Sequence, residues 1–392
     1  MFTQEAKREF SSLLEKSIEQ LDISDAQFEE AEKRYKTVGE WLGGESSPLA
    51  RYEPDIKPQG SFRLGTVVRP WGREDEFDLD LTYKMVIPKT AITQETLKKM
   101  VGDRLKENAL YKRMLDEEKR RCWRLLYSDG TKFHMDIIPC IQDDPQWLIS
   151  LGVPPEIAAH AICITDRKSW NFSTDWPRNN PEGYALWFTG RMKARYLLAE
   201  ASLRMSLQID KVPYYRIKTP LQRSIQLLKR HRDSMYIGDD DKPASIIITT
   251  LAAHAYENEE NLYDTLINIL RKMDNPMFLK IVAGEYRLVN PVNPAENFAE
   301  KWKESPRKQA RFFTWLKEAR RYFEAFTEMK GFPAFATSLN PVLGERFVGK
   351  ALSSIAESHR IQRESGQLRM AAGTGTLGSV GTKVRDHNFH GR

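Results

Sequence analysis

The most constraining feature of the sequence is a run of ten residues, 76–85, in which polar and apolar side chains alternate without a break. Positions 77, 79, 81, 83 and 85 are apolar, and the positions between them are polar. Because successive side chains of a β-strand point to opposite faces, this period of two predicts a strand with one buried and one polar face. Asp78 and Asp80 then leave the polar face about 6.5 Å apart at the backbone.

Two carboxylates on one strand face repel each other, so the pair favours a place where cations neutralise it. Two divalent ions about 3.5 to 4 Å apart, bridged by carboxylates, are typical of phosphoryl and nucleotidyl transfer. Mg²⁺ suits such a site because it prefers oxygen ligands. Taken alone, an Asp-x-Asp pair is more often a solvated polar edge, and further residues have to decide between the two interpretations.

A third carboxylate is predicted on a hairpin. Residues 122–127 and 132–138 have the character of strands, and Ser128-Asp129-Gly130 suits the tight turn between them because Asp-Gly accepts positive φ angles. Asp136 lies on the second strand and shares a face with His134. Asp136 is therefore predicted to approach the first pair across neighbouring strands, although an isolated aspartate is more often structural. We interpret His134 as a structural or supporting residue.

A turn upstream of the first pair has the composition of a phosphate-binding segment. Gln59-Gly60-Ser61 leads into residues suited to a helix, where free backbone N–H groups and a hydroxyl hold phosphates well. Ser61 precedes Asp78 by 17 positions. Most Gly-Ser pairs are ordinary turns, so this motif gains meaning only beside the carboxylates.

Helices are predicted on both sides of this strand region. Residues 2–21 carry an apolar stripe, and a second helix begins at Ser24, which has capping-box spacing to Gln27 and ends at Gly43-Gly44. After Pro220 strands fade, and helices are expected at 221–232, 245–256, 262–273, 298–302 and 311–326.

The length of 392 residues predicts two domains. We place a catalytic lobe at 1–200, a helical lobe at 201–370 and a flexible tail at 371–392, where glycine and threonine replace the apolar pattern. An apolar content of 41% is enough for a sizeable core.

Composition excludes several classes of protein. A formal charge of +6 is too small for this length to indicate a nucleic-acid binder. Three cysteines without a Cys-x-x-Cys pair argue against both a disulfide framework and a cysteine-rich zinc module. The charged N-terminus lacks the apolar region of a signal peptide, and no apolar run is long enough to span a membrane, so we expect a cytoplasmic protein.

The segments QGSFRLGT, EFDLDL and FHMDIIP together resemble the polymerase-beta-like nucleotidyltransferase superfamily. Within it the chain is similar to the bacterial relatives of cyclic GMP-AMP synthase and oligoadenylate synthase, the CD-NTases of CBASS anti-phage signalling. Further support comes from TPLQRSIQLLKRHRD at 219–233, KPAS at 242–245 and NPVNPAENFA at 290–299. The resemblance covers most of residues 1–330.

The resemblance implies a fold and a reaction. The expected fold is an α/β lobe with a mixed sheet and long N-terminal helices packed on it, followed by a mostly helical lobe, with the active cleft between the lobes. The expected enzyme makes a cyclic di- or trinucleotide second messenger from NTPs such as ATP, with two Mg²⁺ ions or Mn²⁺ in their place. An RNA-end or protein-directed nucleotidyltransferase with the same metal site, and a degenerate scaffold, are the alternatives.

The resemblance also implies roles for residues. By match, Asp78, Asp80 and Asp136 are the catalytic and metal-binding residues. The nucleotide-binding residues implied in the same way are Gln59, Gly60, Ser61, Lys229 and Ser245. Without the family, Lys229 is one of several solvated basic residues and Ser245 is a helix cap.

Partners follow from the same resemblance. Some bacterial relatives are conjugated through a C-terminal glycine by ubiquitin-like ligation enzymes, and their product binds an effector. Here Gly391 is followed by Arg392, so conjugation requires removal of that residue, and an end without a role is the alternative. The DNA-sensing animal members carry a Cys/His zinc insertion that this sequence lacks, so we expect no obligatory nucleic-acid activator.

Overall fold

The computed structural model describes residues 4–69, 77–127, 133–171, 175–207, 214–329, 331–370, 377–378 and 381–384. The chain divides into two compact units, which we call the sheet unit and the helical unit. The sheet unit consists of Ile23–Gln222 and Leu279–Glu300, and the helical unit consists of Met1–Asp22, Arg223–Phe278 and Lys301–Arg392. The chain thus passes repeatedly between the units, whereas the sequence interpretation divided it by single cuts at 200 and 370.

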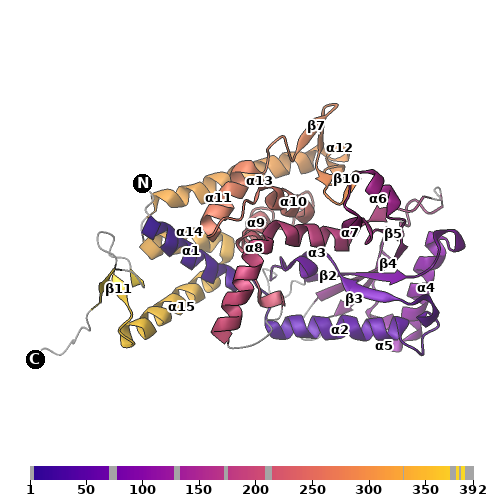
Figure 1. Cartoon of the computed structure of the whole chain (residues 1–392), viewed down its shortest axis with the longest axis horizontal. Coiled ribbons are helices and arrows are strands. Elements are labelled where there is room, and N and C mark those ends of the chain that lie inside the picture. Colours follow the sequence, from indigo (N-terminus) through magenta and orange to yellow (C-terminus); the bar gives the residue numbers. More distant parts are fainter. Residues whose placement is uncertain are drawn as a thin grey trace, which may run out of the picture. The chain divides into compact units, whose positions relative to one another are not determined.

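The sheet unit is built on a six-stranded mixed sheet (Figure 1). The strand order is β1-β2-β4-β5-β6, and β3 pairs with the first half of β4. β2 and β4 are parallel, and the other pairs of the sheet are antiparallel. The strands are β1 Asp55–Pro58, β2 Phe77–Met85, β3 Trp123–Tyr127, β4 Phe133–Gln142, β5 Ile162–Ile164 and β6 Arg178–Asn179. The mixed sheet predicted from the sequence is confirmed.

Two helices cover the apolar face of this sheet. α2 (Asp25–Gly43) and α4 (Gln94–Glu107) contribute to one buried cluster with the apolar residues of β2, β3 and β4. α2 starts with the predicted capping box, in which Ser24 and Gln27 bond each other's backbone N–H groups, and ends at Gly44. The other helices of this unit are α3 Gly60–Leu64, α5 Ala109–Met114, α6 Gln146–Ser150, α7 Pro155–Ala158 and α8 Pro181–Leu207, with short 3₁₀ turns at Ala50–Tyr52, Lys89–Ala91 and Tyr214–Arg216. The opposite sheet face carries polar side chains along β2 and a small apolar cluster of Cys140, Ile162 and Ile164 on β4 and β5.

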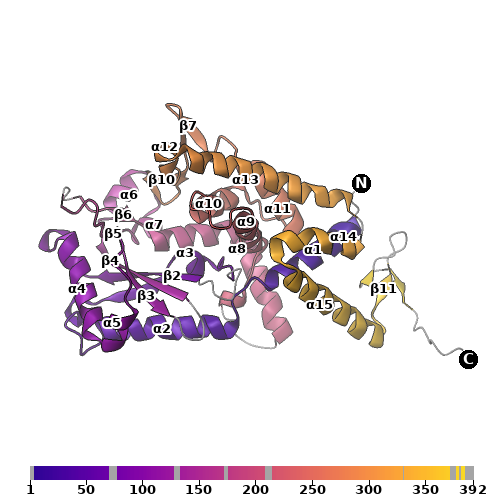
Figure 2. The ribbon, with the colours of Figure 1, turned by 180° about the vertical axis from the view of Figure 1, so that it is seen from behind.

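The helical unit contains the first helix of the chain. α1 (Gln4–Glu19) packs with α11, α14 and α15, and both views of the ribbon show it beside α14 and α15 (Figures 1 and 2). Phe10 lies at the centre of this packing, with its ring centroid 4.5 Å from that of Phe326 and 4.9 Å from that of Phe335. The predicted helix and its buried stripe are confirmed, but the expectation that it packs on the sheet is wrong. An apolar stripe shows which face is buried and not which element buries it.

The remaining helices of this unit follow the predicted segments closely. They are α9 Pro220–Met235, whose first residues belong to the sheet unit, α10 Ser245–Ala255, α11 Leu262–Lys272, α12 Lys301–Glu304, α13 Pro306–Glu324 with a 3₁₀ turn at Ala325–Glu328, α14 Gly331–Leu343 and α15 Glu345–Glu364. The helix expected at 298–302 begins later, at Lys301.

Short strands occur where the sequence predicted none. Two small hairpins follow α11 in the sequence and belong to the sheet unit: β7 Lys280–Val282 with β8 Glu285–Arg287, and β9 Val289–Asn290 with β10 Asn293–Asn297. Strands of two to five residues carry too little alternation to be recognised. Within the predicted tail, Leu377–Gly378 and Thr382–Lys383 pair with Arg369–Met370. The predicted turn at 128–130 and the C-terminal Gly391-Arg392 lie outside the described residues.

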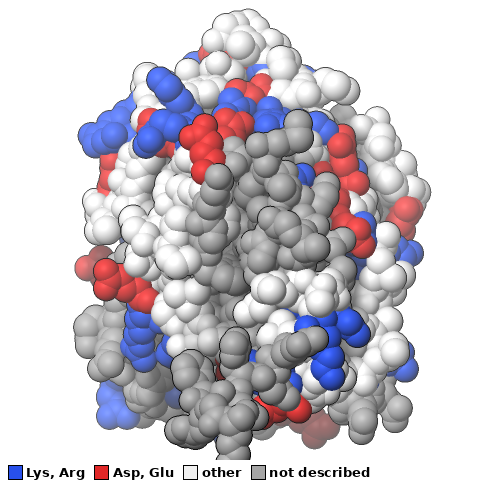
Figure 3. All heavy atoms as spheres, turned by 90° about the vertical axis from the view of Figure 1, so that its left-hand side faces the viewer, with Lys and Arg blue, Asp and Glu red and all other residues white. Residues whose placement is uncertain are grey.

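Charges and cysteines give no sign of another kind of site. Cys122, Cys140 and Cys163 are buried free thiols. Figure 3 shows basic and acidic side chains interspersed with uncharged ones on the face that it draws. Within the described residues, no helix combines the length and apolarity needed to cross a membrane.

Candidate active site

The pairing of β2 with β4 brings the three predicted carboxylates to one face of the sheet. In the parallel register Asp78 is the neighbour of His134, and Asp80 is the neighbour of Asp136. Neighbouring strands lie roughly 4.8 Å apart, so these side chains start from adjacent backbone positions. The predicted approach of Asp136 to the first pair is therefore seen in the register. The intervening residues of β2, Leu79 and Leu81, are fully buried on the other face.

Asp136 is held by an arginine that the sequence analysis did not single out. Arg124 on β3 is its cross-strand partner, and its Nε and Nη2 atoms donate to Oδ1 and Oδ2 of Asp136, each at 2.7 Å. Nη2 of Arg124 also lies 4.0 Å from Oδ1 of Asp78. The hydrogen bond to Asp136 raises the pKa of the Arg124 guanidinium, which is therefore firmly charged. Counting outward from the predicted turn at 128–130 would have placed Arg124 opposite His134, so this pairing with Asp136 was not predictable from the turn.

His134 lies beside Asp78 on the neighbouring strand. Its Nδ1 atom lies 3.5 Å from Oδ1 of Asp78, whose side chain is 64% exposed. This position fits the predicted supporting role. Asp136, by contrast, has a side chain that is only 12% exposed, so the triad combines one open and one largely enclosed carboxylate.

The predicted phosphate-binding turn lies directly against Asp80. The backbone N–H of Gln59 donates to the carbonyl oxygen of Asp80 at 2.8 Å, which fixes the turn to β2. Gly60 has a φ angle of +59°, and a Cβ atom built on it would lie 2.8 Å from Oδ2 of Asp80. Both observations require glycine at this position. Ser61 follows at the start of α3, half-buried.

Residues from distant parts of the sheet unit anchor α3. Gln222 donates from Nε2 to the carbonyl oxygen of Leu64 at 2.9 Å, and Lys218 donates from Nζ to that of Gly65 at 2.7 Å. Arg63 forms an ion pair with Glu182 at 2.7 Å. These contacts hold the turn beside Asp80, and they give a structural reason for Gln222 in the segment 219–233 that supported the resemblance.

The two other predicted nucleotide-binding residues, Lys229 and Ser245, belong to the helical unit. Lys229 lies on α9 and is 6% exposed, so the bare interpretation as a solvated lysine is wrong. Ser245 is the first residue of α10, and its hydroxyl accepts a hydrogen bond of 2.8 Å from Nη1 of Arg232. The N-cap is Ala244, so Ser245 is not the cap that its spacing indicated. Their nucleotide-binding roles stay predictions.

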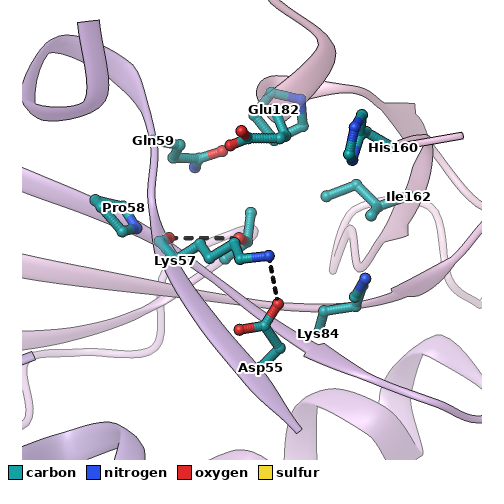
Figure 4. A pocket seen from close by; sticks show the side chains of 10 residues that line it. Asp55, Lys57, Pro58, Gln59, Lys84, His160, Ile162 and Glu182 are labelled. Carbon is teal, nitrogen blue, oxygen red and sulfur yellow. Dashed lines mark hydrogen bonds and ion pairs between the residues drawn. The ribbon is translucent and has the colours of Figure 1, made fainter. Parts of the chain in front are cut away.

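A polar pocket continues the same sheet face beyond Asp80. Thr82 and Lys84 follow Asp78 and Asp80 at the same period of two along β2, and both line this pocket. Figure 4 shows Gln59 at one side of it and Lys57 across its floor, bonded to Asp55 at 2.8 Å. The other lining residues are Pro58, His160, Ile162, Pro181 and Glu182.

The donor set fits a divalent metal in kind. Carboxylate oxygens are the ligands that Mg²⁺ prefers, and three carboxylates share the polar face. Over the described ranges, however, no three His, Cys, Asp or Glu side chains are grouped closely enough to hold one ion. Both oxygens of Asp136 are engaged by Arg124 instead. In a metal site Asp136 would therefore be shared between the ion and the Arg124 guanidinium.

Comparison with known families defines the class of the protein. Residues 54–139 match the family model described as "Cyclic GMP-AMP synthase DncV-like, nucleotidyltransferase domain". The match includes β1 to β3 and most of β4, the turn at Gly60-Ser61 and all three aspartates. The chain thus carries a nucleotidyltransferase domain and is an enzyme of that class.

Similarity to individual proteins extends well beyond this domain. The chain is 28% identical over 375 residues to a c-di-GMP synthase of Roseivirga ehrenbergii, which covers 95% of this chain and 94% of the relative. It is 24% identical over 297 residues to the cyclic dinucleotide synthase CdnG of Bradyrhizobium diazoefficiens, with 72% of this chain and 67% of the relative covered.

The solved structure of the same CdnG with GTP is similar in fold, with a TM-score of 0.67 and 21% identity over 89% of this chain and 99% of that one. These findings confirm the predicted resemblance: the chain carries a nucleotidyltransferase domain and is similar to bacterial enzymes of the group related to cyclic GMP-AMP synthase.

Proposed function

We propose that this enzyme makes a cyclic di- or trinucleotide second messenger from NTPs, in a divalent-metal-dependent reaction that serves anti-phage defence. The observation that carries the proposal is the shared sheet face of Asp78, Asp80 and Asp136, with the Gly60-Ser61 turn against Asp80. Similarity to a c-di-GMP synthase over 95% of the chain supports the cyclic product.

Each residue has a definite task in this reaction. Asp78, Asp80 and Asp136 would hold the metal ions, which supply charge neutralisation and alignment of the reacting oxygens. The backbone N–H of Gly60 and the hydroxyl of Ser61 bind the donor triphosphate next to these carboxylates, with Gln59 as a further contact. Lys229 and Ser245 of the helical unit are further nucleotide-binding residues in this proposal.

The chemical step is a phosphoryl substitution. A ribose hydroxyl of one NTP attacks the α-phosphorus of another, the new P–O bond forms, and the bond to pyrophosphate breaks as the hydroxyl proton leaves. In a cyclic dinucleotide a second such step within the linear intermediate closes the ring, and a cyclic trinucleotide needs one more transfer before closure. The enzyme contributes positioning rather than a covalent intermediate, so small displacements of the carboxylates are costly.

Transfer to an RNA end or to a protein is the alternative that uses the same carboxylates. Incubation of the purified enzyme with the four NTPs and Mg²⁺ or Mn²⁺ separates the two, because a cyclase forms a phosphatase-resistant product without a macromolecular acceptor. Mass spectrometry of that product gives its bases and ring size. Label that appears only on added RNA or protein contradicts the cyclase.

Substitution of the carboxylates tests the site directly. We expect Asp78→Ala and Asp80→Ala to abolish product formation while the melting temperature stays within a few degrees, because loss of one of two repelling carboxylates relieves strain. Asp103→Ala is the matched control, since Asp103 lies on α4, which covers the opposite sheet face, and is 68% exposed. Full turnover in either Asp78→Ala or Asp80→Ala contradicts the assignment.

The cellular setting belongs to the proposal as well. We propose cytoplasmic synthesis of the messenger, which acts through an effector that binds it. Conjugation of the C-terminus by ubiquitin-like ligation enzymes requires exposure of Gly391. Intact-mass analysis of the protein from its host tests this step, since removal of Arg392 lowers the mass by one arginine residue.

A further inference from the structure

We propose that Arg124 is an internal counter-cation of the carboxylate site, which competes with the metal ion for Asp136 and weakens metal binding by the nucleotide-free enzyme. This inference rests on the proposed function, because it assigns Asp136 to the metal. It concerns the order in which the ligands bind. Metal alone binds weakly, and metal that arrives with a nucleotide binds well.

The contacts of Arg124 leave no oxygen of Asp136 unused. Its Nε and Nη2 atoms each donate a hydrogen bond of 2.7 Å to one carboxylate oxygen. This is the bidentate geometry that makes Arg–carboxylate pairs strong. A metal ion coordinates through the lone pairs of the same two oxygens. Each oxygen keeps a second lone pair, so a metal ion would share Asp136 with a guanidinium that already neutralises much of its negative charge.

The guanidinium also acts on the rest of the triad through its charge. Nη2 of Arg124 lies 4.0 Å from Oδ1 of Asp78, so one cation lies beside two of the three carboxylates. Its side chain is 26% exposed, which places it at the open side of the sheet rather than in the core. A divalent cation that enters this site meets a fixed like charge.

A purely structural role explains these contacts less well. β3 is already fixed to β4 by five registered pairs, and Trp123, Leu125 and Tyr127 are buried on the apolar face. The pair between Arg124 and Asp136 is not needed to set that register, whereas it neutralises part of the carboxylate charge that would attract a metal ion. A triphosphate brings negative charge of its own, so a metal bound to a nucleotide does not meet the same repulsion.

Metal titration of the free enzyme tests the proposal. The full-length protein and Arg124→Gln are titrated with Mn²⁺ in the absence of nucleotide, at constant ionic strength, and binding is followed by calorimetry and by the loss of the free Mn²⁺ EPR signal. We expect Arg124→Gln to bind Mn²⁺ at least tenfold more tightly, because even in bulk water two unit charges about 4 Å apart repel by about 1 kcal/mol and Mn²⁺ carries two charges.

A matched control and a second variant sharpen the result. Lys84→Gln removes one positive charge from the same face of β2, where Lys84 bonds Gln142 at 3.3 Å rather than the triad, and it is expected to change Mn²⁺ affinity less than twofold. Arg124→Lys keeps the charge but loses the bidentate geometry, and a rise of two- to threefold is expected. Circular dichroism checks the fold of each variant.

Several results would overturn the proposal. They are an unchanged or weaker affinity in folded Arg124→Gln, an equal gain in Lys84→Gln, and no detectable Mn²⁺ binding in either the parent or Arg124→Gln. If Arg124→Gln fails to fold, the Mn²⁺ affinity of Arg124→Lys provides the test. An affinity of Arg124→Lys no higher than that of the parent contradicts competition between Arg124 and the metal ion. Because the titration contains no NTP, its outcome is independent of whether the product is cyclic.

Discussion

Replacement of Gly60 by alanine provides a sensitive test of the active-site geometry. The backbone of Gly60 has a φ angle of +59°, and the Cβ atom of an alanine would lie 2.8 Å from Oδ2 of Asp80. An ordinary contact begins at about 3.4 Å, so the carboxylate oxygen has to withdraw by about 0.6 Å or the turn has to shift by as much.

Two effects of different size follow from this change. The left-handed backbone conformation costs an alanine about 1 kcal/mol relative to glycine, and this lowers stability. Displacement of Asp80 acts on the transition state, where an error of about 1 Å costs roughly a hundredfold in rate. We therefore expect Gly60→Ala to lose at least tenfold in turnover, equivalent to about 1.4 kcal/mol in the barrier.

Gly152 offers the matched control, because it has a φ angle of +87° but no atom within 4 Å of a built Cβ. Gly152→Ala therefore carries the backbone strain without the collision. Urea unfolding measures stability, and chromatography of the product from NTPs measures turnover for both variants. Equal stability losses with full turnover in Gly60→Ala would refute the contact between this turn and the catalytic carboxylate.

Two further predictions concern the helical unit. Lys229→Ala is expected to raise the KM for NTP more than it lowers kcat in steady-state assays, and an unchanged KM would remove Lys229 from the phosphate site. Burial lowers the pKa of His231 from 6.5 to about 4, so the fold favours the neutral imidazole and its stability falls as pH drops from 6.5 towards 4. Between pH 7.5 and 5.5 the expected loss of unfolding free energy is about 1.3 kcal/mol. The variant His231→Phe keeps an aromatic ring beside Tyr322 and Phe323. We expect urea unfolding of this variant to lack that part of the pH dependence. An undiminished pH dependence in this variant would assign it to other groups.

Local patterns predicted the elements of the site well. The alternation along β2 placed Asp78 and Asp80 on one face because the period of a strand is independent of its surroundings. The capping box at Ser24 and Gln27 is likewise decided by residues three positions apart. Asp136 followed from the hairpin pattern, since an antiparallel pair needs only a turn between its strands.

Long-range partners could not be predicted in the same way. The sequence shows that Arg124 is a basic residue on a predicted strand. Its hydrogen bonds to Asp136 depend on the register of β3 and β4, which is known only when the length of the turn is known. The contact of Gly60 with Asp80 joins residues 20 positions apart through the path of α3. Gln222 reaches α3 from 158 positions away. Such contacts depend on the packing of whole elements, which one sequence does not display.

The place of α1 has a consequence for synthesis of the chain. Its partners α14 and α15 are synthesised long after it, and Phe10 meets Phe335 across more than 300 positions. The first helix therefore emerges with an apolar stripe whose native partners follow much later, α11 first and then α14 and α15. A nascent chain of this kind depends on transient protection by chaperones, and prematurely terminated products should be removed by proteolysis rather than persist as partial enzymes.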